Sequence, residues 1–176
     1  MSDKLTLSPI VTTTFESPVG RLIAAAVDDG ICWLDFAEDS RSERNLEALR
    51  QRFVTTVVSG EHQWLRLLHD ELAAYFERSR EEFTVPIMPR GTPFQERVWR
   101  ELCRVPHGTT ICYEELASRI GQPTAVRAVA NANSQNRINI LIPCHRVIGK
   151  NGDLTGYGGG LSRKRQLLDN EQRASK

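Results

Sequence analysis

Residues 142–149 read Ile-Pro-Cys-His-Arg-Val-Ile-Gly and continue the apolar run Ile138–Ile142. Because Pro143 cannot donate a hydrogen bond to a sheet, we expect a buried strand to end there and to present Cys144 on a rigid turn. The neighbouring His145 and the arginine after it could supply a base and positive potential, both of which favour a thiolate. The stretch therefore predicts a nucleophilic cysteine.

Two helices are expected just before this stretch, over residues 113–120 and 123–134, and the short turn between them makes a helix-turn-helix. Arg127 is the only charged side chain of the second helix. That helix is slim because four of its positions are alanine: Ala125, Ala128, Ala130 and Ala132. It lacks the set of long polar side chains that reads bases in a major groove, which favours minor-groove binding. An alanine-rich packing helix with one solvated arginine is the open alternative.

Residues 1–88 are expected to form an N-terminal strand-and-helix domain. Apolar stretches bounded by turn residues favour strands over residues 11–16, 21–27, 31–36 and 83–87. Apolar side chains at helical spacing favour helices over residues 40–53 and 61–78. This part has no chemical motif of its own, so we interpret it as a scaffold.

A linker containing proline and glycine leads into a second domain, residues 91–176. Thr92, Pro93 and Gln95 form a capping box with proline at the first helical position, which predicts that a helix begins there. This domain also contains the helix-turn-helix and the loop that carries Cys144, and we expect it to be mainly helical. The predicted fold class is therefore α+β.

The chain has 176 residues and a net charge of +1, divided between −6 for residues 1–83 and +7 for residues 84–176. An electropositive half suits a polyanion, although a solvated surface of mixed charge explains it equally well. No apolar stretch reaches about 18 residues, and the N-terminus has no apolar core of a signal peptide. We therefore expect no membrane span and a cytoplasmic location.

The cysteines show no CxxC spacing, which disfavours a disulfide framework and a structural zinc site. They are Cys32, Cys103, Cys112 and Cys144. We expect no bound metal and no cofactor, and a reducing cytosol suits a chain whose important group is a free thiol.

Five segments together resemble one family, in the family's own order. They are GTPFQERVW (91–99), TICYEELA (110–117), PTAVRAVANANSQN (123–136), ILIPCHRVIG (140–149) and GYGGGLSRKRQLLDNE (156–171). The chain is thus similar to the O6-alkylguanine-DNA alkyltransferases of the bacterial stand-alone type, although its first ninety residues resemble that family only loosely. Five ordered blocks are far more specific than a lone Cys-His pair.

The resemblance implies DNA repair by a methyltransferase of the suicide type. The alkyl group of O6-alkylguanine, and also of O4-alkylthymine, would pass irreversibly to Cys144 after base flipping. His145 would act as the base through a bridging water, and Glu171 would orient it as the third member of a triad. Tyr113 would donate a proton to the leaving purine. Since nothing regenerates the thioether, each molecule would act once.

The resemblance also implies how DNA is held. Arg127 would fill the hole left by the flipped base, and Tyr113 would crowd the 3′ phosphate and turn the nucleotide out. Asn136 would brace the hinge that follows the second helix. Further DNA contacts are expected from Ala128, Asn133 and Arg137, and the walls of the base pocket from Val147, Ile148, Tyr157, Gly158, Gly159 and Gly160. The partner would be double-stranded DNA, bound through its minor groove without sequence preference by a monomer.

Two segments need separate comment. Gln135-Asn136-Arg137 stands where family members often have Gly-Asn-Pro or Ser-Asn-Pro, which loosens the hinge but adds a cation that could contact phosphate. The run Arg163-Lys164-Arg165 is expected to be a solvated face of the last helix.

Two other functions stay open. A non-catalytic binder of damaged DNA, similar to the alkyltransferase-like proteins, would lack the active-site cysteine that is present here. A Cys-His hydrolase with true turnover would need an oxyanion hole, for which the sequence has no clear motif.

Overall fold

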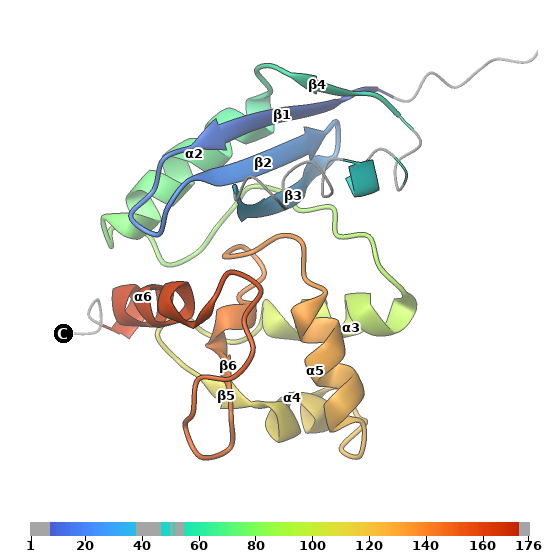
Figure 1. Cartoon of the computed structure of the whole chain (residues 1–176), viewed down its shortest axis with the longest axis vertical. Coiled ribbons are helices and arrows are strands. Elements are labelled where there is room, and N and C mark those ends of the chain that lie inside the picture. The colour runs from blue at the N-terminus through green and yellow to red at the C-terminus, as the bar shows by residue number, and fades with distance from the viewer. Residues whose placement is uncertain (1–7, 38–46, 50, 52–54, 173–176) are drawn as a thin grey trace, which may run out of the picture.

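The computed structural model describes residues 8–37, 47–49, 51 and 55–172, and it has a sheet in its N-terminal part and helices in its C-terminal part (Figure 1). The sheet has the order β3-β2-β1-β4, with β1 and β4 parallel and the other pairs antiparallel. Its strands are β1 (Ile10–Phe15), β2 (Leu22–Val27), β3 (Gly30–Phe36) and β4 (Val57–Ser59). The first three strands confirm the sequence prediction, whereas β4 was not predicted.

Helix α2 (Gln63–Phe76) packs against the sheet and confirms the helix expected over residues 61–78. Part of the helix expected over residues 40–53 lies outside the described residues; residues 47–49 and 51 are helical.

The strand expected over residues 83–87 is wrong, because only Ile87 pairs, in an isolated bridge with Ile31. The buried carboxylate of Glu71 on α2 accepts the backbone N–H groups of residues 84–85, at 3.0 and 3.1 Å. Those donors are therefore unavailable to a sheet, and the proline that follows them has no N–H to offer.

The C-terminal part contains four helices among the described residues: α3 (Pro93–Leu102), α4 (Tyr113–Arg119), α5 (Val126–Ser134) and α6 (Leu161–Gln172). The predicted capping box begins α3, with Thr92 as N-cap and Gln95 closing it. Helix α5 begins three residues later than expected, because the chain first makes a turn in which the Gln122 carbonyl accepts the Ala125 N–H. Two short parallel strands were not predicted, β5 (Ile111–Cys112) and β6 (Val147–Ile148).

One buried apolar cluster runs from the sheet through α3, α5 and α6, and the α+β class is confirmed. Strand β3 lies at the edge of the sheet, yet all its residues are buried, because residues 86–88 and the chain between α5 and β6 bond along that edge. The Leu34 N–H donates to the Arg137 carbonyl, and the Leu34 carbonyl accepts the Asn139 N–H at 2.8 Å. In Figure 1 this chain segment rises from α5 to meet β3. No helix within the described ranges is long and apolar enough to cross a membrane.

Candidate active site

The apolar run before the cysteine is a buried turn, so the strand expected over residues 138–142 is wrong. The side chain of Asn136 accounts for this: its Oδ1 accepts the Ile138 N–H, and its Nδ2 donates to the Ile142 carbonyl, both at 2.9 Å. These bonds satisfy the backbone locally. The turn includes Ile140 at φ 72°, a conformation that β-branched residues rarely adopt and that tight surroundings must hold in place.

Cys144 begins a single 3-10 turn (Cys144–Arg146) and is 4% exposed. Its sulfur lies between two amides: Asn136 Nδ2 donates to Sγ at 3.1 Å, and Sγ–H donates to Asn139 Oδ1 at 3.5 Å. Burial raises the pKa of the Cys144 thiol to about 11, although the Asn136 hydrogen bond and the Lys164 cation act in the opposite direction. The resting sulfur is therefore a thiol at neutral pH.

A cavity of about 500 Å³ opens beside this sulfur. Asp35, Asn133, Arg137, Asn139, Cys144, Tyr157 and Gly158 are among the residues that line it. Four residues expected in the base pocket do not line this cavity: Val147, Ile148, Gly159 and Gly160. Val147 and Ile148 form β6, and Gly159 packs against Phe36, where an added Cβ would lie 2.3 Å from the ring.

His145 and Glu171 form a fully buried pair behind the cysteine. The Nε2 atom of His145 lies 2.8 Å from Glu171 Oε1. The same carboxylate accepts hydrogen bonds from Tyr75 Oη and from two guanidinium nitrogens of Arg146, at 2.9 to 3.0 Å. Because a carboxylate only accepts, Nε2 must donate, which leaves Nδ1 of the neutral ring as an acceptor.

The two partners of this pair respond to burial in different ways. Burial raises the pKa of Glu171, but hydrogen bonds and charge from His145 and Arg146 outweigh it and hold the pKa well below its usual range. Burial lowers the pKa of His145, and the hydrogen bond to Glu171 opposes this only in part. The imidazole is thus neutral at rest and able to take a proton. The guanidinium of Arg146 is paired with the carboxylate of Glu171 rather than with the sulfur of Cys144.

Three buried side-chain atoms have no hydrogen-bond partner within the described residues: Asn133 Oδ1, His145 Nδ1 and Tyr157 Oη. Asn133 and Tyr157 line the cavity, and His145 follows the cysteine that does so. Buried polar atoms are nearly always paired in folded proteins. Their concentration here indicates a site built to receive a polar ligand.

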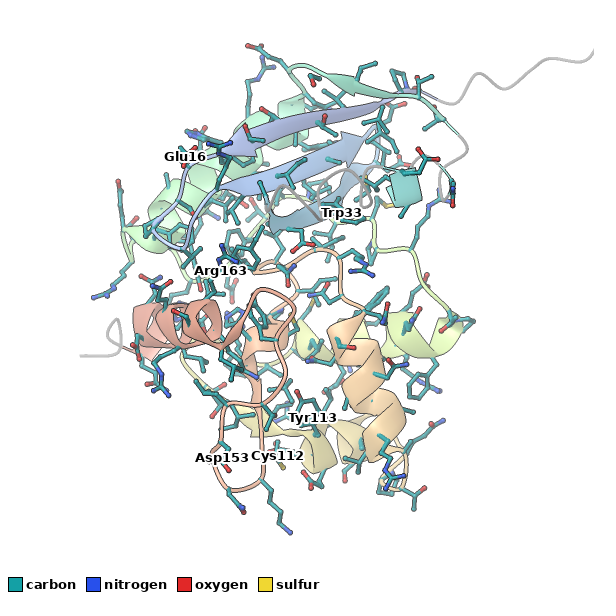
Figure 2. All side chains as sticks on the ribbon, in the orientation of Figure 1. Glu16, Trp33, Cys112, Tyr113, Asp153 and Arg163 are labelled. Atoms are coloured by element: carbon teal, nitrogen blue, oxygen red, sulfur yellow. The ribbon has the colours of Figure 1, made fainter. Side chains whose placement is uncertain are left out.

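Tyr113 is the first residue of α4, and Figure 2 shows it between α5 and the loop that follows β6. Its ring is half-buried, and its hydroxyl interacts with the side chains of Thr155 and Asn133. Burial raises the pKa of Tyr113, and the proximity of Cys144 raises it further. The phenol is therefore protonated and available as a donor near the sulfur.

The residues expected to contact DNA separate into two groups. Arg127 and Ala128 are exposed on α5. Asn133, by contrast, is buried and lines the cavity. The guanidinium of Arg137 lies over the ring of Trp33 on the sheet, 5.8 Å from its centre, while its side chain also borders the cavity.

The run Arg163-Lys164-Arg165 is not a solvated face, so that expectation is wrong. Lys164 is fully buried, and its ammonium donates to the carbonyls of Val147 and Thr155 at 2.5 and 2.8 Å. Arg163 lies at the junction of α6 with the sheet (Figure 2), where it stacks over the ring of Phe36 at 4.6 Å. Of the three, only Arg165 is exposed.

Sequence reasoning missed Asp35, Asn139 and Lys164. Asn139 is the one polar residue within the apolar run 138–142, which is a usable signal. Asp35 is the only charged residue of β3 and is also buried there, and Lys164 stands two helical turns before Glu171. Their partners lie far away in sequence, so pattern alone could not pair them.

Two domains of one protein family match the chain. Residues 93–173 match "6-O-methylguanine DNA methyltransferase, DNA binding domain", and residues 10–89 match "6-O-methylguanine DNA methyltransferase, ribonuclease-like domain". The constitutive methylated-DNA--protein-cysteine methyltransferase of Bacillus subtilis is 39% identical over 93% of this chain and 95% of that protein. The methylated-DNA--protein-cysteine methyltransferase of Mycobacterium bovis is 54% identical over 58% of this chain, and the alignment covers 62% of that protein's length.

A solved structure is also similar, that of Mycobacterium tuberculosis OGT in complex with DNA. Its TM-score is 0.79 and its sequence identity 41%, over 93% of this chain and 94% of that one.

Proposed function

Because the chain belongs to the 6-O-methylguanine DNA methyltransferase family, as the resemblance of residues 91–171 predicted, we propose that it repairs DNA by alkyl transfer. The substrate is O6-alkylguanine in duplex DNA, and the acceptor is Sγ of Cys144. The observation that carries this proposal is a buried cysteine on the wall of a cavity, with the hydrogen-bonded pair of His145 and Glu171 directly behind it.

In this proposal residues 91–176 bind DNA and carry the transfer, and residues 1–88 support them. Helix α5 presents the exposed Arg127 and Ala128 on a slim face, which suits a minor groove and does not require particular bases. The net charge of +7 in residues 84–176 favours a phosphate backbone. The similar OGT structure contains DNA, which supports the same partner.

Base flipping would bring the damaged guanine into the cavity beside Cys144. Arg127 would stack in the hole that the base leaves, and Tyr113 would turn the nucleotide out. Asn133 and Tyr157, whose buried polar atoms are unpaired, are available to meet the polar edges of the base.

The transfer is an in-line displacement at the alkyl carbon. The thiol proton passes through a bridging water to Nδ1 of neutral His145, and Glu171 stabilises the imidazolium that forms. The sulfur electron pair then forms the C–S bond, the C–O bond breaks, and its electrons go to the guanine oxygen. Tyr113 donates a proton to the purine and is reprotonated in turn, so one thiol proton is exchanged for one alkyl group. A thioether has no leaving group, so each molecule acts once.

The experiment is intact-protein mass spectrometry after incubation with a duplex that contains one O6-methylguanine. We expect one methyl group per protein, on the peptide that contains Cys144, and none in Cys144→Ser. Tight binding without an adduct would favour a damage binder, and repeated product formation would favour a hydrolase. A parallel duplex with O4-methylthymine tests the second substrate.

Arg127→Ala tests the DNA-binding part of the proposal. Loss of the stacking guanidinium should slow transfer at subsaturating duplex by about tenfold. Arg165→Ala, which removes an exposed arginine from α6, is the matched control and should have little effect. Equal rates for the two variants would contradict the role of Arg127.

A further inference from the structure

The sulfur of Cys144 lies between two asparagines that present opposite ends of their amides to it. Asn136 turns its N–H toward Sγ at 3.1 Å, which stabilises a thiolate. Asn139 turns its oxygen toward Sγ at 3.5 Å, and an oxygen acceptor stabilises the protonated thiol and opposes the anion. The two residues therefore act on the same proton in opposite directions.

The orientation of Asn139 is set by the N-terminal sheet. Its Nδ2 donates to the carboxylate of Asp35 at 3.0 Å and lies 3.3 Å from the carbonyl of Leu34. Both partners belong to β3, and both only accept hydrogen bonds in this pairing. Reversing the amide would bring its oxygen against a carboxylate and a carbonyl. The oxygen of Asn139 must therefore face the sulfur.

Asp35 is itself held in place. Its Oδ1 accepts the backbone N–H of Phe36 at 2.8 Å, and the residue is 9% exposed. Asn139 is 5% exposed, and its own N–H donates to the Leu34 carbonyl at 2.8 Å. Asn139 is thus bonded to the sheet through both its backbone and its side chain, and its side-chain amide cannot turn without breaking buried hydrogen bonds.

We infer that Asp35 and Asn139 are positioning residues that keep the proton of Cys144 on the sulfur until a substrate occupies the cavity. The inference rests on the proposed function for its purpose, because a protein that can react only once is wasted by any accidental alkylation. At rest the thiol proton is directed to Asn139, while Nδ1 of His145 has no partner among the described residues. Activation then requires the S–H to turn from the amide toward the imidazole.

Other charged and titratable groups also face this sulfur, and each is on a different element. Lys164 on α6 favours the thiolate, and Asp35 on β3 opposes it. Tyr113 on α4 and Tyr157 in the loop after β6 are both close enough to Cys144 to be affected by its charge. His145 is neutral at rest because burial lowers its pKa. None of these groups is hydrogen-bonded to the amide oxygen of Asn139 in the described part of the chain. The contact between that oxygen and the sulfur can therefore be removed separately.

The test is the pH dependence of Cys144 alkylation by iodoacetamide, in short pulses from pH 7 to 11.5. The modified Cys144 peptide is counted by mass spectrometry, and far-UV circular dichroism confirms the fold at each pH. Asn139→Leu removes the acceptor and fills its space. Its rate profile should level off about 0.5–1 pH unit earlier than that of the wild type, which is a three- to tenfold gain below that point.

Asp35→Ala is the second variant, because it removes both the shorter of the two hydrogen bonds that orient the Asn139 amide and a negative charge that opposes the thiolate. Its profile should shift in the same direction, and Asp153→Ala, which removes an exposed carboxylate from the loop after β6, should not shift. Looser packing would raise the rate at every pH and leave the bend in place. An unchanged or upward-shifted bend in both Asn139→Leu and Asp35→Ala would overturn the inference.

Iodoacetamide needs no DNA, so this result is independent of the repair assay. A shifted profile together with no methyl adduct from O6-methylguanine would leave the positioning role standing and remove the proposed function. An unshifted profile with a normal adduct would do the reverse.

Discussion

The two sides of the Cys144 sulfur are built from different parts of the chain and by different chemistry. On the side of α6, the buried carboxylate of Glu171 accepts hydrogen bonds from His145, Arg146 and Tyr75. On the side of β3, the contact is made by the neutral amide of Asn139, which Asp35 and the Leu34 carbonyl orient. The first side can accept a proton and stabilise the resulting charge. The second can only hold the proton where it is.

This difference teaches that the N-terminal sheet is more than a support. Its edge strand supplies backbone hydrogen bonds to the active-site segment and one carboxylate to the cavity wall. We therefore expect the hydrogen bonds around Glu171 to determine both the stability of the fold and the rate of alkyl transfer. The sheet should determine mainly the reactivity of the resting thiol. The predictions below separate these contributions.

The largest effect is expected from Glu171→Gln. The substitution keeps the shape of the side chain but leaves the buried guanidinium of Arg146 without its counter-charge, which should cost about 3–5 kcal/mol of unfolding free energy. Methyl transfer should fall with it, because the imidazolium of His145 loses its stabilising partner. Urea unfolding and single-turnover transfer rates measure the two effects.

The matched control is Glu115→Gln, which breaks the exposed pair with Arg119 and should cost about 1 kcal/mol or less. The pKa of Glu171 is held below its usual range in the folded protein, so the carboxylate stabilises the fold above the ordinary carboxyl pKa. That contribution is lost as pH falls, and the gap between wild type and Glu171→Gln should narrow below about pH 4. A gap that widens in acid would contradict this assignment.

A smaller effect is expected where α6 meets the sheet. In Gly159→Ala the added methyl group would lie 2.3 Å from a ring carbon of Phe36, so the sheet and the start of α6 must move apart. We expect a loss of about 1–3 kcal/mol in thermal or urea unfolding. Gly158→Ala has open space around its Cβ and changes the unfolded chain in the same way, so it is the matched control. Equal stability of the two variants would show that Gly159 is not tightly packed against Phe36.

The parts that sequence predicted well are those with local causes. The capping box at Thr92 and Gln95 begins α3 as expected, because its hydrogen bonds join residues three apart. The first three strands follow from apolar stretches between turns. The helix pair was also found, although α5 begins later than its proline suggested.

What sequence could not predict depends on contacts between distant residues. The run Ile138–Ile142 has the composition of a strand, but the Asn136 side chain captures its backbone groups and folds it into a turn. A lysine such as Lys164 is expected at the surface, but its ammonium bonds to the carbonyls of Val147 in β6 and Thr155 in the loop that follows, and it is buried. The link from Asp35 to Asn139 spans 104 positions, and no local pattern marks it.

The smallest predicted effect concerns Lys164, which lies on the charged side of the sulfur. Burial lowers its pKa to about 8 from an ordinary value of 10.5. The folded protein therefore releases this proton at a lower pH than the unfolded chain does, and stability rises with pH between these two values. A neutral amine still has two N–H groups for the carbonyls of Val147 and Thr155, so deprotonation removes a buried charge without breaking those bonds.

Lys164→Met removes this dependence. The difference in unfolding free energy between wild type and Lys164→Met should grow in favour of the wild type by about 1 kcal/mol from pH 7.5 to pH 9. Lys150→Met, at an exposed position in the loop after β6, should show a constant difference across the same range. Urea unfolding at each pH gives both curves, and taking differences cancels the titration of groups that do not interact with Lys164. A difference that shrinks with pH would mean that Lys164 is stabilised as a cation, in which case the α6 side would hold a positive charge permanently against the sulfur, and Asn139 would have to oppose it.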